Sequence, residues 1–215
     1  MAARWYERLR SWIGRPSQAR ATVAYTAILV ATKLVLDASS PRLNQAILES
    51  VSTNLHQLHV HPVNVLITSA LFVTDRDQLL AFAAVALLIL SPLEQRIGTL
   101  RTIIGFAIGH VGASVAVAAG LSYAVRAGEV SPSIQRTVDV GVSYGTLCLV
   151  AAFAFLINYR LRLVVLFGLL CYSSVAVVMD DDYARWGHLV SVLLGAALVG
   201  PTLVLRRPRR AYELE

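Results

Sequence analysis

Long apolar runs dominate this sequence and limit the folds that are open to it. A helix needs about 20 mostly apolar residues to cross a bilayer, and the runs that meet this description are separated by short polar breaks. We count them at 21–38, 78–93, 101–123, 137–158, 161–179 and 186–205. With 56% hydrophobic and 15% charged residues, the chain is also too apolar for an ordinary soluble domain. The sequence therefore predicts an all-α polytopic membrane protein, a bundle of six transmembrane helices.

The positions of the arginines predict how this bundle is oriented. With six spans, both tails and the second and fourth connections lie on one side of the membrane, and these segments hold most of the arginines. The acidic run Asp180–Asp182 lies on the other side. Because cytoplasmic segments are enriched in Lys and Arg, we expect the protein to lie in the plasma membrane with both termini in the cytoplasm. The net charge of +6 then reflects topology and contact with membrane lipid, and no nucleic-acid partner is predicted.

The chain divides into one membrane domain and two tails. Residues 1–20 mix arginine with tryptophan and tyrosine, which is typical of a segment lying along the cytoplasmic interface; a partly ordered tail explains this composition equally well. Residues 21–205 form the membrane domain, and residues 206–215 form a cytoplasmic tail. The connection 39–77 carries apolar residues at helical intervals. We expect short helices there, in or on the outer leaflet.

No metal or cofactor site is predicted. The two cysteines lie singly inside apolar runs, which supports neither a disulfide framework nor a metal cluster. His56, His59 and His61 lack a carboxylate or cysteine at standard ligand spacing, and polar contacts at the interface explain them better. His110 lies deep in the third run, where an ionisable side chain is a functional candidate by default. A neutral histidine that is hydrogen-bonded to a neighbouring helix is the commoner explanation.

A serine and a histidine lie at matched depth in the fourth and sixth runs. Under the predicted topology Ser143 and His188 both lie near the outer ends of their helices, and their depths agree to within about one turn, or ~5 Å. Small residues that let helix backbones approach closely flank both of them: Gly141, Gly145, Gly187, Ser191 and Gly195. A short serine side chain then reaches an imidazole on the next helix. The pattern favours a proton-transfer pair, although helix packing explains each residue when it is considered alone.

Three motifs, in this order along the chain, resemble those of the rhomboid family of intramembrane serine proteases. Residues 93–98 (Leu-Glu-Gln-Arg-Ile-Gly) resemble the glutamate-to-glycine turn that closes rhomboid span two. Residues 141–143 (Gly-Val-Ser) resemble the start of the GxSG serine motif, and residues 187–195 resemble the AHxxGxxxG histidine motif. The resemblance covers about residues 65–205. It implies a rhomboid-like bundle of six helices with a long outer loop between spans one and two.

The resemblance also implies a Ser-His dyad that cleaves transmembrane proteins near their membrane segments. Ser143 would be the nucleophile that forms the acyl-enzyme, and His188 the general base, with no carboxylate required. Water would enter through a cavity that opens outward. Asp139 lies four residues before Ser143, on the same face of the predicted helix. It is a candidate to orient His188, and we favour the alternative that it marks the water interface.

Departures from the family pattern bear on activity. Rhomboids carry an HxxxN pair in span two whose side chains help to bind the oxyanion, and the corresponding positions are Gln78 and Phe82. Gln78 can donate a hydrogen bond and Phe82 cannot. Tyr144 replaces the glycine after the serine and is a second oxyanion candidate, while Gly187 and Ser191 replace an alanine and a glycine. The alternative is therefore a catalytically impaired rhomboid pseudoprotease that binds membrane-protein clients without cutting them.

Overall fold

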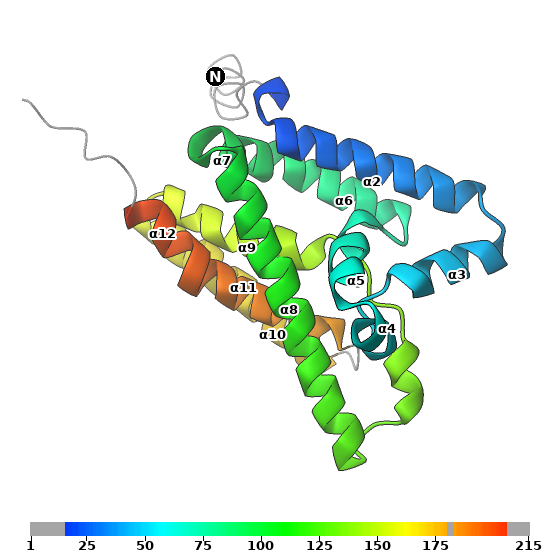
Figure 1. Ribbon diagram of the computed structural model, residues 1–215. Helices are drawn as coiled ribbons and strands as arrows, with labels where there is room; N and C mark the ends of the chain where they lie inside the picture. Colours follow the sequence, from blue (N-terminus) through cyan, green and yellow to red (C-terminus); the bar gives the residue numbers. More distant parts are fainter. Residues whose placement is uncertain (1–15, 180–182, 206–215) are drawn as a thin grey trace, which may run out of the picture.

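The structure is a computed structural model that describes residues 16–179 and 183–205. Within these ranges every regular element is a helix (Figure 1). The greater part of the predicted N-terminal tail, the acidic run 180–182 and the predicted C-terminal tail lie outside the described residues.

Five helices in the described part of the chain are long and apolar enough to cross a membrane. They are α2 (Arg20–Ala38), the continuous helix Arg76–Ile97, α8 (Thr99–Ala127), α10 (Tyr159–Met179) and the helix Ala184–Leu203. Two of them contain a π-helical turn, a widening of the helix by one residue. The first comprises α6 (Arg76–Val85), the π turn Ala86–Leu90 and α7 (Ser91–Ile97); the second comprises α11 (Ala184–Leu194), the π turn Gly195–Val199 and α12 (Gly200–Leu205). These helices indicate a multi-pass membrane protein.

The fourth predicted span is shorter than the sequence suggested. Instead of covering 137–158, it consists of α9 (Ser143–Phe153) and a 3₁₀ turn at Ala154–Leu156. Gly141 has a φ of +140°, a conformation that is favourable only for glycine. Its N–H donates to the carbonyl of Ser69, 3.0 Å away, rather than to a helical partner. Gly141 therefore does not serve as the predicted helix-packing residue, because of the two glycines that flank Ser143 only Gly145 lies in the helix.

The connection between α2 and α6 forms short helices, as its apolar spacing predicted. They are α3 (Pro41–Val51), α4 (Leu55–Val60) and α5 (Pro62–Thr68), followed by a 3₁₀ turn at Ser69–Leu71. Two side chains cap helix starts in the usual way: Ser40 accepts from the N–H of Leu43, and Asn54 from the N–H of Gln57. Figure 1 shows α4 and α5 beside α8, which both of them contact.

Helix α8 is central to the packing and lies against both α9 and α11 (Figure 1). Glycines make this close approach possible. A Cβ atom added to Gly109 of α8 would lie 2.2 Å from the Cβ of Cys148, and one added to Gly195 would lie 2.2 Å from the carbonyl oxygen of the same cysteine. Any larger residue at either position would push the helices apart, so α8, α9 and the end of α11 form one tightly packed unit.

A buried carboxylate joins the starts of α2 and α8. Glu94 of α7 is only 2% exposed. It accepts hydrogen bonds from the N–H groups of Ala21 and Thr22, at 2.9 and 2.8 Å, and from the hydroxyls of Thr22 and Thr99, at 2.7 and 2.6 Å. Four donors offset the cost of burying a charge, and they hold the first turns of the two helices together.

Candidate active site

Ser143 and His188 meet where α9 and α11 pack together. Ser143 is the first residue of α9, and His188 lies in the second turn of α11. Nε2 of His188 is 2.9 Å from Oγ of Ser143. Both residues are partly exposed, so the hydrogen bond is accessible from a cavity. The distance lies within the range for direct proton transfer between a hydroxyl and an imidazole.

The cavity beside this pair has a volume of about 410 Å³, which falls within the range of ligand-binding sites. Its walls come from the outer connection, from the start of α6, from α8, from the connection between α8 and α9, and from the starts of α9 and α11. Polar side chains on these walls include Thr53, Asn54, Thr74, Gln78, Asp139 and Arg185. A polar cavity among helices of membrane-spanning length can hold water next to Ser143.

Hydrogen bonds to the outer connection fix the extended segment that leads into α9. The hydroxyl of Ser52 accepts from the N–H of Asp139 at 2.8 Å, and the N–H of Thr53 donates to the carbonyl of Asp139 at 2.9 Å. Two residues later, the N–H of Gly141 donates to the carbonyl of Ser69. These bonds place the first residue of α9 at a defined point in the cavity wall.

Asp139 does not lie on a helical face shared with Ser143, so that part of the prediction is wrong. Residues 137–141 precede α9 and are not helical. The carboxylate of Asp139 accepts from the hydroxyl of Thr53 at 3.1 Å and from that of Tyr144 at 3.4 Å. Asp139 therefore ties the outer connection to the start of α9. Its proposed role in orienting His188 stays a prediction.

Tyr144 forms a wall of the site and explains two departures from the rhomboid motifs together. Its side chain is 3% exposed, and its ring meets that of His188 edge to face, with centroids 5.5 Å apart. A Cβ atom added to Gly187 would lie 2.3 Å from this ring. The tyrosine after the serine therefore occupies the volume that becomes free because glycine, not alanine, precedes the histidine. The tyrosine hydroxyl points to Asp139, so its role in binding an oxyanion stays a prediction.

Gln78 lies in the first turn of α6 and reaches the cavity. Its Nε2 would be 3.5 Å from a Cβ atom added to Gly141, and its Oε1 accepts from the N–H of Thr74 at 3.3 Å. The amide group of Gln78 therefore lies beside Gly141, two residues before Ser143. Phe82, one turn further along α6, is 3% exposed and packs in the core. Only one of the two HxxxN positions therefore faces the cavity.

The N-terminus of α9 supplies further donors. The N–H of Thr146 donates to the carbonyl of Val142 at 3.1 Å, the first helical bond of α9. The N–H groups of Ser143, Tyr144 and Gly145 precede this bond and lie at the positive end of the helix dipole. A developing negative charge next to Ser143 would be stabilised there.

The remaining predicted small residues lie at helix contacts. A Cβ atom added to Gly145 would lie 2.5 Å from the ring of Phe106 on α8. Ser191 is fully buried on α11, one turn after His188. Gly195, described above, lies against α9. These positions let α9 approach α8 on one side and α11 on the other.

The sequence analysis missed a second serine–histidine contact. Nε2 of His110 on α8 is 3.1 Å from Oγ of Ser69 in the 3₁₀ turn of the outer connection, and both residues are buried. His110 is thus hydrogen-bonded to a neighbouring segment, the commoner explanation given above. Ser69 has no local pattern that marks it, because its partners lie about 40 and 70 residues further along the chain.

The other histidines do not gather around an ion site. His56, His59 and His61 are all exposed on α4 or at its end. In the ranges that the structure describes, no group of three His, Cys, Asp or Glu residues is arranged to hold a metal ion.

Helices of membrane-spanning length around a polar cavity define the class of this molecule, a multi-pass membrane protein with a polar site among its helices. Its family follows from comparison with known proteins. The family model described as rhomboid-like protein matches residues 16–208. The chain therefore belongs to the rhomboid-like family. Neither a curated protein nor a solved structure matches it.

Proposed function

We propose that this protein is an intramembrane serine protease of the rhomboid-like family, with Ser143 as the nucleophile and His188 as the general base. One observation carries the proposal: the 2.9 Å hydrogen bond between these side chains opens onto a polar cavity among helices of membrane-spanning length. The family includes serine proteases, which agrees with this assignment.

In this reaction His188 takes the proton of Ser143 while Oγ attacks the carbonyl carbon of a peptide bond. The resulting imidazolium then protonates the leaving amine, and the acyl group remains on the serine. Water in the cavity, activated by the same histidine, hydrolyses the ester and releases the second product. These steps need only the serine, the histidine and water.

The oxyanion of the tetrahedral intermediate needs donors close to Ser143. The backbone N–H groups in the first turn of α9, at the positive end of its helix dipole, and the amino group of Gln78 are the proposed donors. Preorganised donors of this kind typically contribute about a hundred- to a thousandfold each to the rate. The substitution of a core phenylalanine for one side-chain donor predicts slower turnover than a complete HxxxN pair would give.

The short length of α9 supports a site below the membrane surface. Ser143–Leu156 extends roughly 21 Å at 1.5 Å per residue, whereas the hydrocarbon core is about 30 Å thick. We take α9 to lie in the membrane as well, in addition to the five long helices, with its far end at the cytoplasmic interface. Ser143 then lies inside the outer leaflet. A substrate would be a transmembrane protein cut near its own membrane segment. The protease itself would lie in the plasma membrane with both termini in the cytoplasm.

A fluorophosphonate probe, which labels activated serines, tests the proposal on purified full-length protein in detergent. We expect the parent to be labelled on Ser143, and expect Ser143→Ala and His188→Ala to lose labelling. Ser114→Ala, which changes a buried serine on α8, is the matched control and should be labelled like the parent. Absence of labelling in a folded parent would overturn the catalytic assignment.

A second function, the binding of membrane-protein clients without cleavage, is favoured by one observation. Phe82 is packed in the core at a position where rhomboids place an oxyanion donor. A photo-crosslinker placed at the cavity rim would capture full-length clients under this hypothesis, and Ser143→Ala would leave the captured amount unchanged. Cleaved clients that accumulate only with the parent would support the protease instead.

A further inference from the structure

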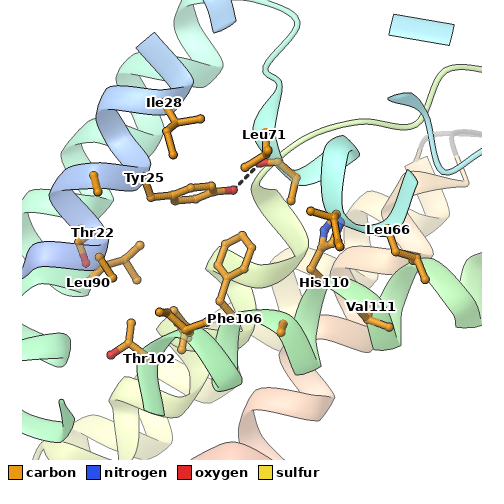
Figure 2. Close-up of a pocket in the computed structure, with 17 residues that line it drawn as sticks. Thr22, Tyr25, Ile28, Leu66, Leu71, Leu90, Thr102, Phe106, His110 and Val111 are labelled. Carbon is orange, nitrogen blue, oxygen red and sulfur yellow. Dashed lines mark hydrogen bonds between the residues drawn. The ribbon is translucent and has the colours of Figure 1, made fainter. Parts of the chain in front are cut away.

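A second cavity lies between α2 and α8, away from Ser143. It has a volume of about 490 Å³, and its wall is almost entirely apolar. Figure 2 shows Tyr25 reaching across it from α2, with Phe106 and His110 rising from α8 and Leu66 and Leu71 at one end. Ile28 and Ile103 on its rim are 43% and 51% exposed, so the groove is open at its side.

The few polar side chains on this wall are hydrogen-bonded within the protein. The hydroxyl of Tyr25 donates to the carbonyl of Ala70 at 2.5 Å, and that of Thr102 donates to the carbonyl of Gly98 at 3.1 Å. The hydroxyl of Thr22 bonds to Glu94, and His110 bonds to Ser69. An occupant made only of hydrocarbon would break none of these bonds.

The dimensions of the groove fit one leaflet of a bilayer. Its lining on α8 extends from Thr102 to Val111, which is roughly 14 Å at 1.5 Å per residue. This is about half of the 30 Å hydrocarbon thickness, and therefore matches the depth that one acyl chain occupies.

Among the described residues, exposed arginines flank one end of the groove. Arg20 begins α2, next to the lining residue Ala21, and Arg101 lies in the first turn of α8, next to Thr102. Both arginines are exposed. The carboxylate of Glu94, which joins these two helix starts, is buried and taken up by four donors. The opposite end is closed by the apolar residues of α5 and the 3₁₀ turn.

We propose that this groove binds a phospholipid with an anionic headgroup, one acyl chain lying between α2 and α8 and the phosphate lying between Arg20 and Arg101. The apolar wall recognises the chain, and the two guanidinium groups recognise the headgroup. The lipid belongs to the leaflet on the arginine-rich side, which the charge distribution predicts to be cytoplasmic. The site is independent of the proposed protease chemistry.

Native mass spectrometry of the full-length protein tests this site, with phosphatidylglycerol and phosphatidylcholine of identical chains as the probes. The parent should retain one phosphatidylglycerol more tightly than phosphatidylcholine, by roughly 30-fold for two arginines at a charged surface. Arg20→Gln combined with Arg101→Gln should make the two lipids equal. Arg126→Gln, an exposed arginine in the last turn of α8, is the matched control and should keep the preference.

Filling the groove tests the acyl-chain part of the proposal. Ala107 lines the groove and is exposed, so Ala107→Phe should lower retention of both lipids by at least roughly tenfold, because several buried methylenes are displaced. Ala24→Phe, which fills the groove from α2, should lower the retention of both lipids in the same way. Ala116→Phe, at an exposed site on α8 outside the groove lining, is the control.

Three results would overturn the proposal. The first is a groove-filled variant that stays folded and retains lipid like the parent. The second is an equal loss of lipid in Ala116→Phe, which would mean that lipid binds all over the apolar surface. The third is a dimer mass that disappears in Ala107→Phe while lipid retention does not change, which would assign the groove to a second copy of the chain.

Discussion

Two serine–histidine contacts in this protein have nearly the same length and very different surroundings. Ser143 and His188 are 2.9 Å apart and partly exposed at a polar cavity. Ser69 and His110 are 3.1 Å apart and buried, at 0% and 3% exposure. Tyr144 stands between them, with its ring centroid 5.5 Å from that of His188 and 6.3 Å from that of His110.

This contrast shows that a short serine–histidine distance does not by itself make a catalytic pair. A hydroxyl within reach of an imidazole is necessary for nucleophilic catalysis, but a carbonyl and water must also reach the serine, and donors must face the oxyanion. The first pair has a cavity, a helix N-terminus and Gln78 beside it. The second pair is buried, with His110 on the wall of the apolar groove, and the carbonyl of Ser69 also accepts the N–H of Gly141 and so helps to hold the segment in front of α9.

The largest expected effect comes from removing each imidazole in turn. His188→Gln should slow fluorophosphonate labelling by about a hundred- to ten-thousandfold, the usual contribution of a general base. His110→Gln keeps a side chain that can hydrogen-bond to Ser69 and should leave labelling close to the parent rate. Labelling rates of the two variants, measured on folded protein, make the comparison. Equal losses in both would mean that the two histidines are not functionally distinct.

The next largest effect on labelling is expected at Gln78, the side-chain donor that lies beside the Ser143–His188 pair. Gln78→Leu removes the amino group next to Gly141 and should slow labelling by about a hundred- to a thousandfold. Gln78→His, which restores the rhomboid residue, should recover most of this rate. An unchanged rate in Gln78→Leu would mean that Gln78 does not stabilise the oxyanion, and would leave the cavity and the N-terminus of α9 as the features that distinguish the first pair.

Much of the fold follows from the sequence because apolar run length is a local property. Five of the six predicted runs form helices of membrane-spanning length. The start of α9 was not predictable in this way, since three valines among residues 137–142 continue the apolar run into the helix that follows. Their extended form depends on hydrogen bonds to Ser52, Thr53 and Ser69, which are about 70 to 90 residues away in the chain.

The same distinction applies to the site. Matched depth and flanking small residues indicated that Ser143 and His188 lie close together, and the structure brings them together. Asp139 was placed on a helix face because a helix was assumed to begin at 137. The contact between Tyr144 and Gly187 could be noticed in the sequence only as two separate departures from a motif, since their shared volume becomes visible once α9 and α11 are packed together.

A smaller effect is expected from disturbing the wall between the two pairs. Gly187→Ala places a methyl group 2.3 to 2.6 Å from the ring of Tyr144, and should lower the free energy of unfolding by about 1–3 kcal/mol. Combining it with Tyr144→Gly restores the rhomboid residues at both positions. A double-mutant cycle should then give a favourable coupling of about 0.5–3 kcal/mol.

Denaturant unfolding in detergent measures this coupling. Gly120→Ala, at a glycine of α8 with no atom within 4 Å of an added Cβ, is the control and should be neutral or slightly stabilising, since alanine favours a helix. Additive effects of the two substitutions would mean that Tyr144 and Gly187 do not compete for one volume.

The smallest effect on labelling is expected at the buried pair. Ser69→Ala leaves the imidazole of His110 without this partner and should lower the free energy of unfolding by about 1–3 kcal/mol. The bond from the N–H of Gly141 to the carbonyl of residue 69 involves only backbone atoms and is retained. Folded Ser69→Ala should therefore be labelled on Ser143 at the parent rate, although it unfolds at a lower denaturant concentration. Loss of labelling without loss of stability would show that the buried pair takes part in the chemistry, and the distinction between the two pairs would fail.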